Sequence, residues 1–200
     1  SQLYAHTRPV GFVADNTEGL TGKDLDKLVV DEQGITNMVK RSAGQAIKLE
    51  GGADKTKLSD NNIGTLVKGT NQVDIKLAKE LKGLTSAEFK DGTNTTIING
   101  KGVTINANGP SMTTDGIHAG NLKVTGVASS IADQVVNNNP NLTFIDKLNQ
   151  ANTTNPKNAV NVSDLHNVLS GANGGGFGLK DQDDAEVKQD LGTTVKVKGD

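Results

Sequence analysis

The chain has 200 residues, of which 34% are hydrophobic and only 2% aromatic, and its formal net charge at pH 7 is −2. This balance gives no electrostatic basis for binding nucleic acid or an anionic membrane surface, so neither partner is predicted. The lack of cysteine excludes a disulfide framework and a thiol nucleophile. Aromatic side chains usually supply much of the buried area of a core, so this chain must be stabilised by another route. Its 24 glycines and many Asn and Thr residues predict numerous turns and thin β-structure.

The N-terminal part mixes strand and helix signals. The apolar cluster at 10–13 predicts a strand. Thr21, with Asp24 three residues later, predicts a capped helix that carries the apolar residues between 25 and 29. The spacing of the apolar residues at 35–39 predicts a second helical turn.

An internal repeat relates the start of the chain to its end. The stretch 39–52, VKRSAGQAIKLEGG, aligns without a gap with 187–200, VKQDLGTTVKVKGD, and both predict a turn, a strand and a turn. A Gly-Phe pair precedes each copy, Gly11-Phe12 in the first and Gly176-Phe177 in the second. Self-similarity of this kind is typical of a modular array.

The middle of the chain predicts two hairpins. Apolar and polar residues alternate over 66–77 on either side of the turn residues 69–71. The stretches Thr95–Ile98 and Gly102–Ile105 flank Asn99-Gly100, a dipeptide that suits a tight turn with positive φ.

The segment Asn158–Leu169, NAVNVSDLHNVL, changes its apolar period partway. Two valines lie two residues apart, as in a strand, and the following leucines and valine recur at helical spacing. We therefore expect a strand that turns into a helix of less than three turns, with Ser163 as N-cap and Gly171 just after its end. So short a helix is not stable alone, which indicates that copies of the segment bury each other.

Further signals surround this segment. Thr143 and Asp146 have the spacing of a capping box before the apolar residues Phe144, Ile145 and Leu148, so a helix is expected there. The glycine-rich tract 171–178 predicts a turn into the next module and a flexible connector.

NAVNVSDLHNVL, preceded by NLKVTGVA at Asn121–Ala128, resembles the neck of trimeric autotransporter adhesins, the surface fibres of Gram-negative bacteria. The resemblance implies a mainly β fold with short helices and a homotrimeric, intertwined β-prism fibre, in which a strand like KVTGVA leads into the neck. The modules would be a mixed module at 1–42, a β-rich head-like module at 43–120, a neck at 121–170 with an insertion at about 129–157, and a further β-module from 171 to 200. Some head modules of the family carry a ring of Trp, which this chain lacks.

The resemblance also implies where the subunits meet. The residues expected to pack between chains are Val160, Asn161, Val162, Leu165, Val168 and Leu169. In a three-chain assembly the Asn161 amide, on the opposite side of the strand from the two valines, would bond backbone groups of a neighbouring chain.

The function implied is structural and adhesive: an extracellular, outer-membrane-anchored fibre presents binding surfaces to host-cell or extracellular-matrix molecules, and this segment itself contacts no membrane. No catalytic residue, metal site or cofactor is predicted, because the histidines are far apart and the acidic stretch 181–186 lacks the spacing of an EF-hand loop. Two alternatives stay open: a segment of a phage tail fibre or spike, and a secreted β-solenoid enzyme acting on polysaccharide, which requires a carboxylate pair that the sequence does not display.

Overall fold

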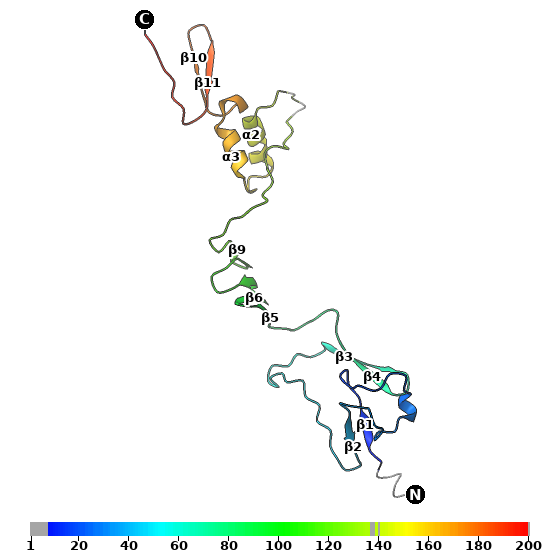
Figure 1. Cartoon of the computed structure of the whole chain (residues 1–200). Helices are drawn as coiled ribbons and strands as arrows, with labels where there is room; N and C mark the ends of the chain where they lie inside the picture. The colour runs from blue at the N-terminus through cyan, green and yellow to red at the C-terminus, as the bar shows by residue number, and fades with distance from the viewer. Residues whose placement is uncertain (1–7, 137–138, 140, 200) are drawn as a thin grey trace. The chain divides into compact units, whose positions relative to one another are not determined.

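The computed structural model describes residues 8–136, 139 and 141–199, and shows a mainly β chain with two short α-helices (Figure 1). The chain divides into two compact units, Ser1–Val103 and Thr104–Asp200. The first unit holds hairpins joined by long loops. The second holds the two α-helices and the C-terminal hairpin.

The first hairpin pairs β1 (Val10–Phe12) with β2 (Val39–Arg41) in antiparallel fashion, which confirms the strand expected at 10–13. The helix expected after Thr21 is wrong in extent and cap: a single 3₁₀ turn, η1 (Leu25–Lys27), forms, and its N-cap is Asp24. The helical turn expected at 35–39 is also wrong, because β2 begins at its last residue and pairs with β1. Pairing between strands has overridden the local helical spacing.

The second hairpin, β3 (Ile63–Lys68) and β4 (Gln72–Leu77), confirms the alternation found in the sequence. Residues directly opposite in the register share a face. One face is therefore apolar except for one threonine, and its members are Ile63, Thr65, Val67, Val73, Ile75 and Leu77. The five apolar side chains are 60–81% exposed, so nothing within the described chain covers this face.

Asn62 closes the base of this hairpin, a role that the sequence did not indicate. It is 4% exposed. Its amide Nδ2 donates to the carbonyl of Lys82 at 2.8 Å, and its Oδ1 accepts from the Lys82 N–H at 2.9 Å. Because both polar ends of the amide are satisfied, its burial is compatible with folding.

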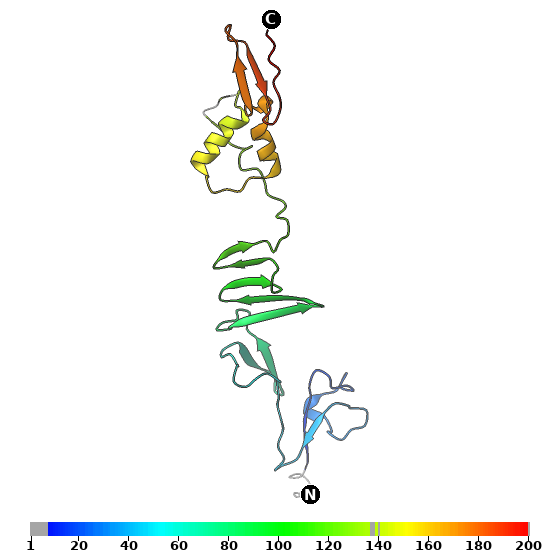
Figure 2. The ribbon, with the colours of Figure 1, turned by 90° about the vertical axis from the view of Figure 1, so that its left-hand side faces the viewer.

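A five-stranded sheet follows, in the order β5 (Ser86–Asp91), β6 (Asn94–Asn99), β7 (Gly102–Ile105), β8 (Ser111–Thr113) and β9 (Gly116–His118) (Figure 2, green). The hairpin expected around Asn99-Gly100 is confirmed by the neighbouring positions of β6 and β7. The expected positive φ is wrong for both residues of that dipeptide, and Gly102 takes it instead, at 136°.

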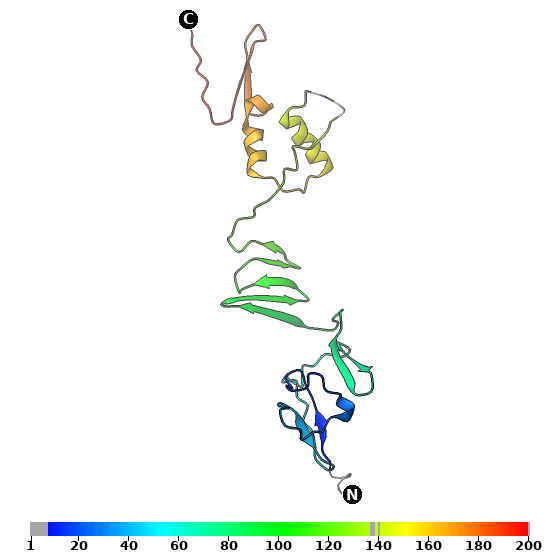
Figure 3. The same cartoon turned by 45° about the vertical axis from the view of Figure 1, so that its right-hand side comes forward.

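The second unit contains α2 (Phe144–Thr154) and α3 (Val162–Leu169), which lie beside each other (Figure 3, yellow to orange). The capping box predicted for α2 is confirmed: Thr143 Oγ1 accepts from the Asp146 N–H, and the Asp146 carboxylate accepts from the Thr143 N–H. The strand implied at Asn121–Ala128 is wrong, since those residues form no regular structure. The short 3₁₀ turn η2 (Gly171–Asn173) leads to β10 (Phe177–Lys180) and β11 (Glu186–Gln189).

The internal repeat is real in structure, but its parts differ from the expectation. Lys40 lies opposite Gly11 in the first hairpin, and the aligned Lys188 lies opposite Gly178 in the last. The glycine that corresponds to Gly11 is therefore Gly178, two residues beyond the predicted Gly176.

The turn after each repeated strand is also the same. The Gln45 N–H donates to the Ser42 carbonyl at 3.1 Å, and the aligned Thr193 N–H donates to the Asp190 carbonyl at 3.3 Å. The glycine within each turn has a φ of 83° or 87°. The repeat thus runs as strand, then turn, and the strand expected after the turn does not form in either copy.

The Asp146 carboxylate makes α2 sensitive to acid. Hydrogen bonds from the N–H and hydroxyl of Thr143 lower its pKa below the ordinary value of 3.8. A lowered folded-state pKa means that the stabilisation is fully present above the ordinary pKa and is lost as the pH falls through the folded value. We expect the helical circular dichroism of α2 to be constant from pH 7 to about 5 and to weaken below 3.8. Asp146→Asn should flatten the part of the acid transition that α2 contributes, and an unchanged transition would contradict this assignment.

Candidate assembly site

A buried carboxylate organises the segment expected to join the subunits. Asp164, on the first turn of α3, is 1% exposed. Its Oδ1 accepts a hydrogen bond from the Ser129 hydroxyl, and its Oδ2 accepts from the Asn161 N–H at 3.2 Å. The Ser129 oxygen in turn accepts from the N–H groups of Ile131 at 3.2 Å and Ala132 at 2.9 Å. The carboxylate therefore ties α3 to a turn more than thirty residues earlier in the chain.

Asn161 is the N-cap of α3, so the predicted N-cap, Ser163, is wrong and no strand precedes the helix. Its Oδ1 accepts from the Asp164 N–H at 2.9 Å, which completes a capping box. Its Nδ2 donates to the carbonyl of Val127 at 3.0 Å, within the same chain. The Asn161 amide is thus bonded within its own chain, and the expected bond to a neighbouring chain stays a prediction.

These contacts decide which way α3 faces. Its polar Asp164 points inward, whereas Val162 is 86% exposed and Leu165 is 58% exposed. Leu169 is 37% exposed. These three side chains recur at spacings of three and four residues, so they form one row along the helix. We call Val162, Leu165 and Leu169 the outer row.

The remaining predicted residues lie beside the outer row. Val160, just before the helix, is 59% exposed. Val168, three residues after Leu165, is half-buried, and Asn161 is half-buried at the cap. The structure therefore brings four apolar residues of the predicted set to the outside and uses the other two within the chain.

The glycine tract after α3 is a close-packed junction, and the predicted flexible connector is wrong. The Gly171 N–H donates to Asp190 Oδ1 at 2.7 Å, and the Leu191 N–H donates to the Leu169 carbonyl at 3.0 Å. A Cβ at Gly175 would lie 1.7 Å from the Val168 carbonyl oxygen, and one at Gly176 would lie 2.0 Å from that of Gln189. The glycines are needed because backbone passes against backbone here.

Within residues 8–136, 139 and 141–199, no group of three or more His, Asp or Glu is placed to hold a metal ion. The described helices are too short and too polar to cross a membrane. Of the three histidines, His6 lies outside the described residues. Asp181 forms the turn between β10 and β11, where its Oδ1 accepts from two backbone N–H groups at 2.9 Å, so its carboxylate is used locally.

The junction offers a direct test of its packing. Gly175 has no unusual φ, so Gly175→Ala should destabilise this unit through the clash with the Val168 carbonyl alone, by roughly 1–3 kcal/mol. Gly199→Ala is the matched control, because nothing lies within 4 Å of a Cβ there. Urea unfolding of both variants would check this, and equal stabilities would contradict a close-packed junction.

Asn161 combines a cap and a tether, and two substitutions separate them. Asn161→Ala removes both and should lower the stability of α3 by roughly 2 kcal/mol, whereas Asn161→Ser keeps a capping oxygen and should lose about half of that. Amide hydrogen exchange in α3 would measure the difference. If both variants behaved like the parent, neither hydrogen bond would contribute to the helix.

Neither a protein-family model nor a curated protein sequence matches the chain. Solved structures that are similar to it include parts of two bacterial proteins. N-terminal domain 1 of VompD from Bartonella quintana is 27% identical, with 69% of this chain and 91% of that chain covered and a TM-score of 0.33. The C-terminal stalk of AtaA from Acinetobacter sp. Tol 5, fused to GCN4 adaptors, is 23% identical, with 55% of this chain and 30% of that chain covered and a TM-score of 0.23. At such low TM-scores, neither match bears on the arrangement of this chain. Both are parts of trimeric autotransporter adhesins, the family that the neck residues of this chain resemble.

Proposed function

We propose that the chain is a segment of a homotrimeric bacterial surface fibre of the trimeric autotransporter adhesin type. One observation carries the proposal: the chain by itself has almost no core. Ile131 and Ala151 are the buried hydrophobic residues of the described chain. Stability has to come from surface that other copies cover.

The apolar residues are placed where other copies can cover them. The outer row of α3 has the three-and-four spacing of an apolar helix face, and because its side chains are exposed in the single chain, helices of other copies can cover it. The hairpin β3–β4 carries a second apolar face, and a two-stranded hairpin is at best marginally stable in water without a covering layer. Three identical copies around an axis would bury each such residue three times.

The subunit packing therefore includes Val160, Val162, Leu165 and Leu169 directly, with Asn161 and Val168 holding the helix in place. The same proposal includes the β-prism, the four modules from 1–42 to 171–200, and the neck insertion at about 129–157. So does the location, an extracellular passenger of an outer-membrane-anchored protein. The role is structural and adhesive, holding binding surfaces toward host-cell or extracellular-matrix molecules.

The two alternatives fit less well. A β-solenoid stacks its strands in parallel coils, whereas the pairs β1–β2, β3–β4, β5–β6, β8–β9 and β10–β11 are all antiparallel. A phage tail fibre shares the trimeric, core-poor design. The sequence resemblance of the neck at Asn121–Ala128 and Asn158–Leu169 favours the adhesin.

The mass in solution tests the assembly. Light scattering should give three times 20.8 kDa.

In a lone chain, replacing exposed apolar residues by Ser changes the free energy of unfolding by about 0.5 kcal/mol or less. In the trimer, Val162→Ser with Leu165→Ser should lower the melting temperature strongly and make it dependent on protein concentration, because each change occurs in three copies.

Ser163→Ala is the control for this experiment, since Ser163 is exposed on the same helix and is neither three nor four residues from any member of the outer row. A parent protein that is monomeric, or a double variant that melts like the parent and the control, would sink the proposal.

A further inference from the structure

Three Asn-Gly pairs occur in the sequence, at Asn99, Asn108 and Asn173. An Asn that precedes Gly can react with its own backbone, because the next peptide nitrogen is within reach of the side-chain carbonyl carbon and glycine has no Cβ to obstruct the approach. The fold gives the three pairs different surroundings. Local geometry therefore decides which of them can react.

Asn99 has the geometry that favours the reaction. It is the last residue of β6, and both Asn99 and Gly100 are exposed where β6 turns into β7. The Asn99 Oδ1 accepts a hydrogen bond from the Lys101 N–H at 2.9 Å. Because this bond spans two residues, it folds the side chain over the intervening peptide unit, whose nitrogen belongs to Gly100. The donor also polarises the side-chain carbonyl and stabilises the oxyanion that forms when a nucleophile attacks it.

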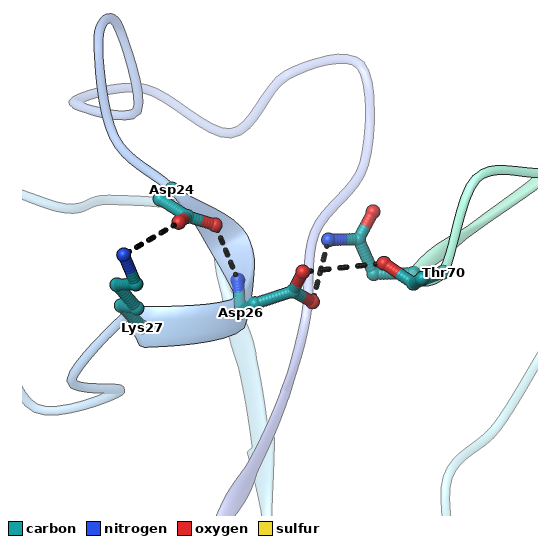
Figure 4. Close-up of polar contacts among 5 residues, drawn as sticks. Asp24, Asp26, Lys27 and Thr70 are labelled. Carbon is teal, nitrogen blue, oxygen red and sulfur yellow. Dashed lines mark hydrogen bonds and ion pairs between the residues drawn. The ribbon is translucent and has the colours of Figure 1, made fainter.

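Other residues form the same turn without the same chemistry. The Asp24 Oδ1 accepts from the Asp26 N–H at 3.0 Å (Figure 4), but a carboxylate has no ammonia to release. The Asn139 Oδ1 accepts from the N–H two residues later at 2.9 Å, but the residue between them is Pro140, which has no N–H to become a nucleophile. The turn at Asn99 has both the amide and the following glycine.

The pair at Asn173 is held by hydrogen bonds at both reacting groups. The Gly174 N–H, whose nitrogen is the nucleophile in this pair, donates to the Gly171 carbonyl at 3.1 Å. The Asn173 Nδ2, the leaving group, donates to the Asn167 Oδ1 at 3.1 Å. Both bonds have to break before the side chain and the backbone can react, so this pair is protected.

The pair at Asn108 is restrained by packing of the backbone. A Cβ at Gly109 would lie 2.0 Å from the Ile105 carbonyl oxygen, so the glycine passes directly against the main chain. The peptide that joins Asn108 to Gly109 therefore has little room to rotate. At Gly100, in contrast, nothing lies within 4 Å of an added Cβ, and the peptide is free to turn toward the side chain.

We propose that Asn99 is a site of self-modification, at which the folded chain deamidates. The Gly100 nitrogen loses its proton to hydroxide and attacks the Asn99 Cγ. The new C–N bond closes a five-membered succinimide ring, the bond from Cγ to Nδ2 breaks, and ammonia leaves after taking a proton from water, which restores the hydroxide. A second water opens the ring at either carbonyl and gives aspartate or isoaspartate. The net reaction consumes one water and releases one ammonia, with no change of oxidation state.

Both products alter the hairpin. Each adds one negative charge to the chain, and isoaspartate also places one extra carbon atom in the main chain. Asn99 lies opposite Ser86 in the register of β5 and β6. An extra main-chain atom displaces the backbone groups there from their partners, as a bulge does. An aged chain therefore differs from a new one in charge and in the pairing at this end of β6.

The test compares the three pairs within one protein. The folded chain is incubated in mildly alkaline buffer, and peptide mapping by mass spectrometry follows the exchange of NH₂ for OH at each Asn. We expect Asn99 to react roughly tenfold faster than Asn108 or Asn173. In concentrated urea, where the turn and the packing are lost, the three rates should become similar. Equal rates in the folded chain, or a faster reaction at either of the other two pairs, would overturn the proposal.

Gly100→Ala tests the attack itself. The φ of Gly100 lies outside the left-handed region and the space for its Cβ is empty, so we expect the fold to be kept. The added methyl group obstructs the nitrogen and should slow deamidation of Asn99 by roughly tenfold. Gly64→Ala is the matched control, because it too has an empty Cβ position and an ordinary φ, and it should leave the rate unchanged.

Circular dichroism of both variants verifies the fold. A folded Gly100→Ala chain that deamidates at Asn99 as fast as the parent would contradict the backbone attack. If this variant did not fold, the comparison of the three pairs in the parent chain would still decide the proposal.

Discussion

The buried carboxylate of Asp164 is the constraint on which the second unit depends. It draws Ser129 and the backbone of Asn161 to one point, and so fixes both the start of α3 and the rotation of that helix. Burying an unpartnered charge costs several kcal/mol, so the helix keeps the face that satisfies Asp164 turned inward. The outer row is exposed as a consequence. Because the Asp164 carboxylate is hydrogen-bonded within its own chain, the apolar outer row of α3 stays available to other chains.

The glycine junction extends this order to the following hairpin. Because Gly175 and Gly176 let backbone pass against the backbone of Val168 and Gln189, the hairpin is held against the end of α3 by hydrogen bonds. A repeated hairpin that is fixed to the preceding helix suits a chain built from modules in series.

The first unit depends on a different balance. Among residues 8–103, the buried side chain is Asn62, a polar residue that closes a hairpin, while five apolar side chains of β3 and β4 stay 60–81% exposed. Such a hairpin has local hydrogen bonds but little hydrophobic stabilisation of its own.

Much of this could be predicted from local sequence. The alternation at 66–77 determined a hairpin, and the Thr143–Asp146 spacing determined a capped helix, because both signals act through neighbouring backbone groups. The shortage of aromatic residues indicated a chain without an ordinary core. Tertiary structure decided the rest. Asn161 is the cap in place of Ser163 because Val127 and Asp164 satisfy its amide. The counterpart of Gly11 is Gly178 and not Gly176, because strand register depends on the partner strand. Interactions between residues thirty or more positions apart leave no periodic trace in the sequence.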